Sequence, residues 1–318
     1  MLPLDDILSV RSEADFRRAA MELFEFQARE CAPYREYIAL CGIDARRVRE
    51  PKQIPFMPIG LWRSHRVYCG DGEPEIVFTS STTGGTEPSR HFMAFEQDYR
   101  ATFRRAFELF YPGRRSIYAL LPNYLQRTGS SLVFMADDLI RRGGGGFYLD
   151  DHDALLRDMA ADRGGKILLG VSYALWELAE RGCVCLENTT VMETGGMKGR
   201  REELPKEEFH ALLCNAFGVS EIASEYGMAE LSSQAYSSGR GIFRTPPWMR
   251  VLARDINDPF SRPEPGRSGG LDIIDLANRF SCAFVQTDDV GRVWPEGSLE
   301  ILGRIDHSVA RGCNLLVD

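Results

Sequence analysis

The sequence predicts an α/β fold with a largely parallel sheet, followed by a smaller β-rich part. From residue 76 to residue 194, short apolar segments alternate with amphipathic ones, and this alternation is typical of strands and helices in layered α/β proteins. From residue 241 onward, short apolar runs are separated by Pro, Gly and Asp, which favours antiparallel strands. The chain of 318 residues is long enough to bury a large core in one or two domains.

The first 75 residues are expected to be mainly helical. Ser12 can cap a helix over residues 12–30, in which apolar side chains recur near helical spacing. A second helix is expected to begin near Pro33. The prolines of residues 51–58 then predict a loop that leads into the α/β part.

The elements expected after residue 75 follow from the apolar runs and their breakers. The expected strands are 76–78, 116–121, 147–149, 166–170, 189–194, 250–254, 270–274, 283–287 and 299–302. The expected helices are 131–141, 153–161 and 172–181. Four glycines at 143–146 are expected to form a turn rather than a linker, because apolar residues resume at once.

Composition excludes several classes of function. The net charge of −8, from 38 basic and 46 acidic residues, argues against general binding of nucleic acid, which requires a basic face. No apolar run approaches the roughly 18 residues of a membrane span, and the N-terminus does not resemble a signal peptide. Among the eight cysteines, the close pair Cys183 and Cys185 has no matching second pair, so zinc is not expected. We therefore expect a cytoplasmic protein with reduced thiols.

A run of hydroxyl side chains and glycines follows the expected strand at residue 76. Hydroxyls and backbone N–H groups can surround phosphate oxygens, and glycine lets the backbone approach them closely. The run lacks the Gly-Lys-Ser/Thr ending of a P-loop, and a polar turn without a ligand is the alternative interpretation. The candidate nucleotide-binding residues in this loop are Thr79, Ser80, Ser81, Thr82, Thr83, Gly84, Gly85 and Thr86.

Three further motifs follow in order. They are EYGMAE at 225–230, QTDDVG at 286–291 and LGRID at 302–306, the last running into Arg311-Gly312. With the hydroxyl-rich loop they resemble, in order and distance, the core motifs of the adenylate-forming superfamily. The ending at 303–313 most resembles the acyl-protein synthetase branch of bacterial bioluminescence operons, which is related to phenylacetate–CoA ligases. The resemblance covers the chain from about residue 75 to its end.

The resemblance also implies an architecture. It predicts a layered adenylate-forming large domain with a parallel sheet, a small β-rich subdomain, and a C-terminal mobile domain that is truncated or absent. In the superfamily that mobile domain carries a catalytic lysine that bridges the acid and the phosphate. We therefore divide the chain into an N-terminal helical region (1–75), an α/β nucleotide-binding core (76–240), a β-rich subdomain (241–302), and a hinge with a short tail (303–318).

The resemblance assigns roles to individual residues. Tyr226 is expected to stack on adenine, and Glu230 to hold Mg²⁺ against the phosphates, since a hard cation prefers carboxylate oxygen. Asp289 and Arg304 are expected to bind the ribose, because a carboxylate can accept from both hydroxyls of a diol. The further candidate nucleotide-binding residues are Gly195, Gly196, Met197, Lys198, Gly227 and Met228. The alternative interpretations are an ordinary Gly-Gly turn at 195–196 and a solvated acid at 230.

The chain departs from the family pattern at several positions. Ser81 stands where the family has Gly, and the Pro-Lys pair that normally follows is missing. We take Arg90 as the candidate replacement for that positive charge and His91 as a second candidate catalytic donor, although His91 can also be a structural histidine. Ala229 replaces a Thr that would reach the α-phosphate, and Asp288 stands at a Gly position, so that either of the two aspartates can serve the ribose.

Cys313 lies where the acyl-protein synthetase branch carries its acyl group on a cysteine. A thiolate near a mobile C-terminus is suited to accept an acyl group and pass it on. The alternative is a small buried residue in a closing strand, since apolar residues follow at 315–317. Cys313 is therefore a candidate catalytic nucleophile.

The leading hypothesis is an acyl-adenylate-forming ligase that uses ATP and Mg²⁺. It activates a fatty or aromatic acid and hands the acyl group to a thiol, which is its own cysteine, a partner or carrier protein, or coenzyme A. Tyr118, Tyr124, Phe134 and Trp176 are candidates for the acid pocket, although each can equally be core. The alternatives are a nucleotide- or acyl-adenylate-binding protein with little catalysis, and an acyltransferase that does not use ATP.

Overall fold

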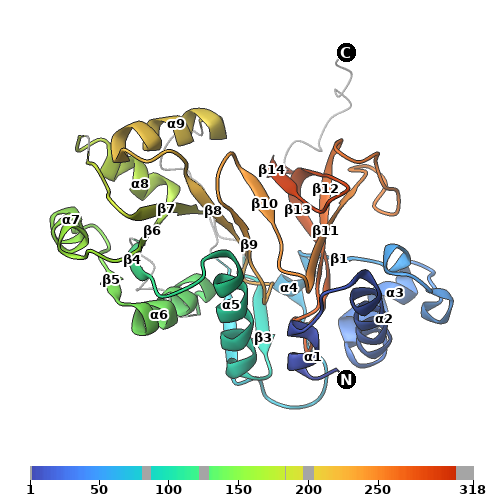
Figure 1. Ribbon diagram of the computed structural model, residues 1–318. Coiled ribbons are helices and arrows are strands. Elements are labelled where there is room, and N and C mark those ends of the chain that lie inside the picture. Colours follow the sequence, from blue (N-terminus) through green and yellow to red (C-terminus); the bar gives the residue numbers. More distant parts are fainter. Residues whose placement is uncertain (1, 81–86, 122–128, 183, 196–203, 306–318) are drawn as a thin grey trace.

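The structure is a computed structural model that describes residues 2–80, 87–121, 129–182, 184–195 and 204–305. Within these ranges a mixed, twelve-stranded sheet forms the centre of the fold (Figure 1). The strands follow the spatial order β11 (Met249–Arg254), β12 (Ser268–Asp275), β13 (Phe284–Val293), β14 (Leu299–Arg304), β10 (Ile242–Arg244), β9 (Ala235–Ser237), β8 (Ala223–Tyr226), β7 (Thr189–Thr194), β6 (Lys166–Val171), β4 (Ser116–Leu120) and β5 (Gly145–Phe147), and β1 (Met57–Pro58) pairs with β13. A separate hairpin consists of β2 (Ile76–Thr79) and β3 (Arg90–Met93).

Helices cover the sheet and the N-terminal region. The α-helices are α1 (Leu4–Leu8), α2 (Glu13–Glu30), α3 (Ala32–Leu40), α4 (Leu61–Ser64), α5 (Glu96–Phe110), α6 (Ser131–Gly143), α7 (His152–Ala161), α8 (Ser172–Ala179) and α9 (Lys206–Phe217), with short 3₁₀ helices at Ala45–Arg47 and Pro51–Gln53. In Figure 1, α5 to α9 surround the part of the sheet formed by β4 to β8, and α1 to α3 lie beside the part formed by β11 to β14. No helix in the described ranges is long and apolar enough to cross a lipid bilayer.

One half of the sheet is parallel. Strands β5, β4, β6, β7 and β8 are neighbours in this order, and every pair is parallel. All six residues of β6 are buried, as expected for a parallel strand covered on both faces. Because the strands run in the same direction, Thr194 and Tyr226 end β7 and β8 at the same sheet edge. This is the edge at which ligands bind in open α/β sheets.

The other half of the sheet is mainly antiparallel and rests on the N-terminal helices. Phe284 of β13 packs against Phe24 of α2 and Tyr34 of α3, with ring centroids 6.0 and 6.1 Å apart. The Gln27 amide donates to the carbonyls of Asn278 and Arg279 at 2.8 and 3.0 Å. The side-chain oxygen of Gln27 accepts from the Ala283 N–H at 2.9 Å. Helix α2 therefore holds the segment between β12 and β13. This segment carries Asn278, which contacts the backbone of Glu230.

Most of the expected elements are present with small changes at their ends. Ser12 caps α2, since its side chain accepts from the Asp15 N–H, and the strand at 189–194 has the expected bounds. Strand β13 runs on to Val293, well past the expected end at 287. Strands β3, β8, β9 and β10 and helices α5 and α9 were not predicted.

The four-glycine segment is not a simple turn, and the strand after it lies two residues earlier than expected. Gly143 ends α6, and Gly145 begins β5, which pairs in parallel with β4. A Cβ on Gly145, where φ is +98°, would lie 2.0 Å from the carbonyl oxygen of Ile117. Glycine is therefore required for β5 to approach β4 this closely.

The sheet continues through the expected boundary at residue 240. Phe243 of β10 pairs with Ser237 of β9, so the core and the β-rich part share one sheet. Met57 of β1 pairs with Val285 of β13, which ties the N-terminal region to the same sheet. The division into four regions remains a prediction.

Candidate functional site

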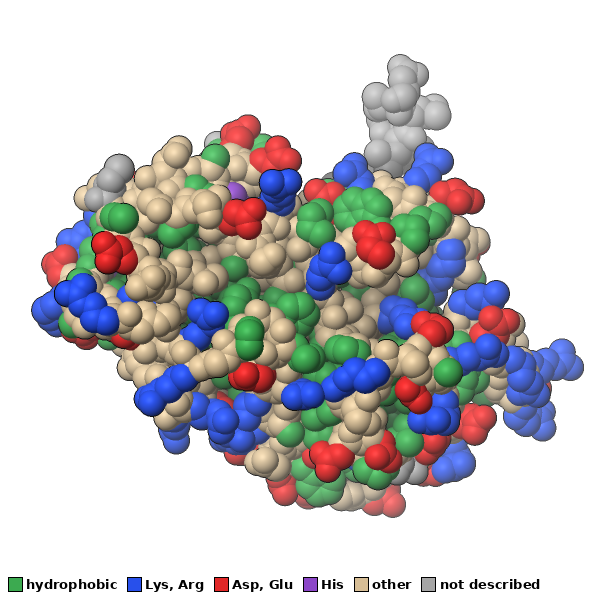
Figure 2. Space-filling view, viewed as in Figure 1, with side chains coloured by type: hydrophobic (Ala, Val, Ile, Leu, Met, Phe, Trp, Pro, Cys, Tyr) green, Lys and Arg blue, Asp and Glu red, His purple; other side chains and the backbone are tan. Residues whose placement is uncertain are grey.

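The candidate site lies at the carboxyl ends of β7 and β8, near the middle of β13 and the end of β14. The loop ends at Ser80 and Ser89 lie in this region with the turn after Tyr226, with Asp289 in the middle of β13 and with Arg304 at the end of β14. Figure 2 shows the molecular surface hollowed between the part that bears α8 and α9 and the part that bears β12 to β14. Motifs far apart in the sequence thus come to one sheet edge.

Asp289 is held between two motif residues. The Tyr226 hydroxyl donates to Asp289 Oδ2 at 2.6 Å, and Arg304 Nε donates to Asp289 Oδ1 at 2.9 Å. Asp289 and Arg304 are cross-strand partners in β13 and β14. Burial raises the pKa of the Tyr226 phenol well above its ordinary value, so this hydroxyl remains protonated and donates. Each Asp289 oxygen retains a lone pair for a ligand hydroxyl.

The two ends of the hydroxyl-rich loop are joined to each other and to Glu230. The Ser80 N–H donates to the Ser89 carbonyl at 3.1 Å, and the Ser89 N–H donates to Ser80 Oγ at 3.0 Å. The two hydroxyl oxygens are 2.8 Å apart, and the Ser89 hydroxyl also donates to Glu230 Oε1. The loop is therefore anchored directly beside the Glu230 carboxylate.

Gly129 contacts the β2 strand of the β2–β3 hairpin at Thr79. The Thr79 N–H donates to the Gly129 carbonyl at 2.8 Å. Gly129 has φ +87°, and a Cβ there would lie 2.9 Å from Thr79 Oγ1. Only glycine fits this position without strain, so the start of the loop is fixed by a residue that sequence reasoning did not identify.

Glu230 is a buried carboxylate that forms no ion pair with the residues that the structure describes. Its exposed fraction is 5%, and burial raises its pKa, while the bond from Ser89 and the charges of Arg304 and Arg63 lower it. In the described ranges no Lys, Arg or His lies within ion-pair distance of it. A buried charge requires a partner, so the position suits a bound cation.

A complete protein cage for a metal ion is not present in the described part of the chain, where no three His, Cys, Asp or Glu side chains are grouped suitably. Mg²⁺ does not require such a cage, because it usually takes one or two carboxylates together with phosphate oxygens and water. Glu230 therefore fits Mg²⁺ that arrives with a polyphosphate.

His91 lies inside the protein behind Glu230. Its Nδ1 is 2.8 Å from the Ala229 carbonyl, and its Nε2 is 2.7 Å from Asn278 Oδ1. Asn278 Nδ2 in turn donates to the Glu230 carbonyl at 2.9 Å. Burial lowers the pKa of His91 to about 4, against the opposing effect of its two contacts. Both ring nitrogens face acceptor oxygens inside the protein, and the neutral imidazole donates its single N–H to one of them. The side chain is fully buried, behind the backbone at 229–230.

Behind Tyr226 lies a second buried carboxyl group, which was not predicted. Thr194 Oγ1 donates to Glu225 Oε2 across the ends of β7 and β8, and burial raises the pKa of Glu225 to about 7. A Cβ on Gly227 would lie 2.6 Å from Glu225 Oε1 and 3.2 Å from Gln234 Cγ. The glycine of the motif therefore makes room for these two side chains. The signal in the sequence was the acid directly before Tyr226.

The end of β7 is fixed by Glu193, a further residue that was not predicted. Its carboxylate accepts from Ser172 and Ser224 at 3.0 and 2.9 Å and lies 2.9 and 3.1 Å from Lys206 Nζ and His210 Nε2. Burial raises its pKa, but the bonds and charges of His210 and Lys206 outweigh this and hold it at about 2. The Ser172 hydroxyl also lies 2.9 Å from the carbonyl of Gly195. Because its partners lie 13 to 31 residues away in the chain, they leave no local pattern in the sequence.

The other candidate residues take varied positions. Arg90 is exposed at the start of β3, with its guanidinium 5.8 Å from the centre of the Phe92 ring. Tyr118 is buried, and Phe134 packs against the rings of Phe78 and Tyr99. Candidates that lie outside the described residues are Ser81, Thr82, Thr83, Gly84, Gly85, Thr86, Tyr124, Gly196, Met197, Lys198 and Cys313.

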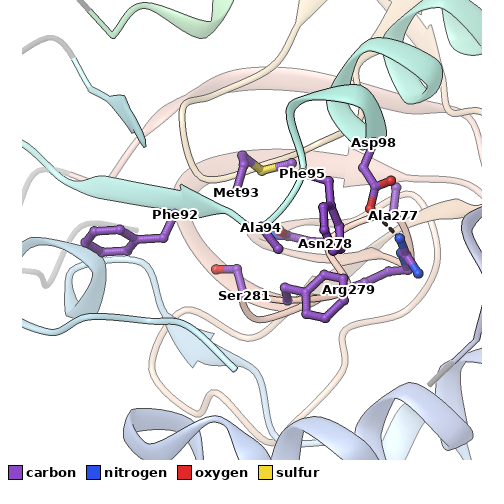
Figure 3. Close-up of a pocket in the computed structure, with 10 residues that line it drawn as sticks. Phe92, Met93, Ala94, Phe95, Asp98, Ala277, Asn278, Arg279 and Ser281 are labelled. Carbon is purple, nitrogen blue, oxygen red and sulfur yellow. Dashed lines mark hydrogen bonds and ion pairs between the residues drawn. The ribbon is translucent and has the colours of Figure 1, made fainter. Parts of the chain in front are cut away.

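A small cavity lies near the site, and its lining includes Met93 and Asn278. It lies between β3, the start of α5 and the segment after β12, and Figure 3 shows Arg279 and Asp98 facing each other at its edge. Its volume of about 10 Å³ is enough for about one water molecule. Arg279 Nε is buried without a hydrogen-bond partner in the described structure, and a water there would satisfy it. The cavity is too small for a substrate.

Solved structures share this architecture. An open form of 2-hydroxyisobutyryl-CoA ligase in complex with 2-HIB-AMP and CoA superposes with a TM-score of 0.69, at 13% identity, over 94% of this chain and 77% of that chain. The chain shares the fold of this ligase. The thioesterification state of the same ligase gives a TM-score of 0.69, at 13% identity, over 96% of this chain and 73% of that one. The predicted layered α/β fold class is thereby confirmed.

A third match is shorter. ATP-bound MatB from Rhodopseudomonas palustris superposes with a TM-score of 0.56, at 16% identity, over 74% of this chain and 49% of that chain. The present chain thus spans about half the length of MatB. No protein-family model and no curated protein matches the sequence.

Proposed function

We propose that this chain activates a carboxylic acid with ATP and Mg²⁺ as an acyl-adenylate. The observation that supports this is the convergence of two groups at one sheet edge. One group is Tyr226 with Asp289 and Arg304, and the other is Glu230 with the anchored ends of the hydroxyl-rich loop. The charge of Arg304 also lowers the pKa of Glu230, against the effect of burial, which supports the assignment of both groups to one site.

The residues divide the binding of ATP between them. The Tyr226 ring offers a flat surface to the adenine, and the Asp289 carboxylate accepts from the ribose hydroxyls. Ser80 and the N–H groups of the loop donate to the outer phosphates. Glu230 holds Mg²⁺, which neutralises phosphate charge when bound. Arg304 keeps Asp289 oriented.

The proposed reaction joins an oxygen of the acid to the α-phosphorus and breaks the bond from that phosphorus to the leaving pyrophosphate. Two anions have to meet, so catalysis depends mainly on positioning and on fixed positive charge. We further propose that a thiolate then attacks the acyl carbon, which forms a thioester and breaks the bond to the phosphate oxygen, so that AMP leaves. The candidate acceptors are Cys313, a partner or carrier protein, and coenzyme A, which one of the similar ligases holds in its complex.

The alternative is a nucleotide- or acyl-adenylate-binding protein with little catalysis. Ala229, which replaces the hydroxyl residue of the motif, favours it, because the Ala229 side chain is a buried methyl group and its carbonyl is held by His91. One donor to the α-phosphate is thus missing. An ATP-independent acyltransferase is the third candidate, and labelling of Cys313 by an acyl thioester without ATP would support it.

The deciding experiment is acid-dependent exchange of pyrophosphate into ATP, with Mg²⁺ and a panel of fatty and aromatic acids. The native chain is compared with Glu230→Ala and with Glu264→Ala, which removes an exposed acid from the β-rich part. We expect exchange to require an acid and to fall by about 10²–10³ in Glu230→Ala only, as for the loss of one electrostatic contact in an active site. Tight binding of ATP without exchange, whatever acid is added, would refute adenylation and leave the binding protein.

A further inference from the structure

A large groove lies away from the candidate site, at the opposite edge of the sheet. It is formed by the second half of α5, the loop that leads into β4, and the last turn of α6. Because β4 begins there at Ser116, whereas Thr194 and Tyr226 end their parallel strands at the site, the groove is at the amino edge. Its volume is about 670 Å³, within the range of about 300–1,000 Å³ that is usual for small-molecule sites.

The groove is strongly basic. Its lining includes the arginines Arg104, Arg105, Arg114, Arg115 and Arg142 and one acid, Glu108. This concentration of positive charge is unusual in a chain with a net charge of −8. Figure 2 shows Lys and Arg side chains gathered around α5 and α6 at the lower left of this face.

Most of these charges are not neutralised within the protein. Arg104 is paired with the buried carboxylate of Asp138, its Nε lying 2.7 Å from Oδ2. Within the described ranges the other four arginines of the groove form no ion pair. Glu108 instead accepts from the N–H of Gly113 at 3.1 Å, which closes the turn after α5.

The guanidinium groups of Arg114 and Arg115 differ in their hydrogen bonds. Arg114 Nε donates to the carbonyl of Gly143 at the end of α6, at 3.2 Å. Arg115 Nε is buried and has no hydrogen-bond partner in the described structure, and a Cβ on Gly165 would lie 3.3 Å from its Nη1. A buried donor without a partner is costly, so the groove contains a donor that an added acceptor would satisfy.

Apolar side chains also line the groove. They are Phe107 of α5, Ile117 of β4 and Leu139 of α6. Guanidinium groups match phosphate and carboxylate oxygens through two parallel hydrogen bonds. We propose that this groove is a second binding site, separate from the adenylation site, for an organic phosphate with an aromatic or aliphatic body.

Binding of 1-naphthyl phosphate, measured by calorimetry, tests this. The probe combines an apolar body with one phosphate group. The test variant is Arg114→Gln/Arg142→Gln. The matched control is Arg46→Gln/Arg47→Gln, which removes the same charge from an exposed 3₁₀ helix.

We expect the probe to bind one site, and to bind at least about tenfold more weakly in the groove variant, because two charged hydrogen-bonding groups are lost. The control is expected to bind like the native chain, and 1-naphthol without its phosphate to bind much more weakly. Melting temperatures show whether the variants fold. If the groove variant does not fold, Arg114→Lys/Arg142→Lys replaces it, because lysine keeps the positive charge but lacks the paired N–H donors of a guanidinium group.

Equal affinity in the groove variant and the control would overturn the proposal, and so would the absence of saturable binding. Displacement of the probe by ATP with Mg²⁺ would place it in the nucleotide site and would also overturn it. The groove variant is expected to retain pyrophosphate exchange, so the two proposals fail independently. A chain without exchange that still binds the probe through Arg114 and Arg142 would refute adenylation alone.

Discussion

The Tyr226 hydroxyl donates to Asp289 at 2.6 Å, although the two residues are 63 positions apart in the chain. Strands β9, β10 and β14 lie between their strands in the sheet, so the contact joins the end of β8 to the middle of β13 and not two neighbouring strands. Arg304 completes the arrangement from β14. Two motifs that share no local structure are thereby joined through one carboxylate.

Removal of this hydroxyl is expected to weaken nucleotide binding. In Tyr226→Phe the ring remains, but Asp289 loses a donor whose bond to a charged group is worth about 1.5–3 kcal/mol. We expect the KM for ATP in pyrophosphate exchange to rise by about tenfold, equivalent to about 1.4 kcal/mol. Combined with Asp289→Asn, the two effects should not add, because both changes remove the same contact. Fully additive effects would contradict the role given to this contact, and Tyr111→Phe, a hydroxyl deletion outside the site, is the control.

Gly227→Ala is expected to damage the site, because its Cβ would lie 2.6 Å from Glu225 Oε1 and 3.2 Å from Gln234 Cγ. The displacement of packed side chains costs about 1–3 kcal/mol, and the turn that carries Tyr226 has to shift. We expect a lower melting temperature and weaker binding of ATP. Gly72→Ala is the matched control, since nothing lies within 4 Å of a Cβ there. Similar losses in both variants would show that the Gly227 contacts are unimportant.

Glu225 is expected to make the protein less stable as the pH rises towards neutrality. Its pKa is raised by burial from 4.5 to about 7 in the folded protein, so the folded state binds more protons than the unfolded state between these values. The contribution is fully present below pH 4.5 and is lost as the pH rises through 7, a change of about 3 kcal/mol for this group.

Glu225→Gln should remove this dependence and stabilise the protein at pH 8, while its amide oxygen can still accept from Thr194. Urea unfolding at pH 5 and pH 8 measures the difference. Glu221→Gln, an exposed acid that precedes the same strand, is the control. If the native chain and Glu225→Gln show the same change in stability between pH 5 and pH 8, the raised pKa of Glu225 is contradicted.

His91→Ala is expected to destabilise the fold by about 2–4 kcal/mol, because it leaves a cavity and buried groups without partners. The affected groups are the carbonyl of Ala229 and Asn278 Oδ1. His65→Ala, at an exposed position, should change stability little. A chemical denaturation series measures both. Loss of pyrophosphate exchange in His91→Ala with unchanged stability would point instead to a direct catalytic role for this histidine.

Local patterns accounted for most of the architecture. The alternation of apolar and amphipathic segments predicted the parallel half of the sheet, and Ser12 predicted the start of α2. Short strands were missed where the pattern is too brief to show periodicity, as in β9 and β10, each three residues long. The glycines at 143–146 were misread because their role is close contact with β4, which is not visible in the sequence.

The candidate site divides in a similar way. Tyr226, Glu230, Asp289 and Arg304 were selected as candidates from motifs, and the fold brings Tyr226 and Arg304 to Asp289 and joins Glu230 to the end of the hydroxyl-rich loop. Glu193, Glu225 and Asn278 were not identified, because their partners come from other strands and helices and leave no spacing in the sequence. His91 was selected for its chemistry, and only its burial shows that its nitrogens are already engaged.

The sequence by itself thus determined the elements, their order and the residue types that can bind a nucleotide, since propensity and periodicity act over a few residues. Only the tertiary structure decided which carboxylates carry a paired charge, which stay buried without a cation, and which arginines remain available to a ligand. Those properties depend on burial and on distances between residues far apart in the chain. The pairing of Glu193 with Lys206, against the absence of a cation beside Glu230 in the described structure, is the clearest example, because two similar acids differ only in what the fold places next to them.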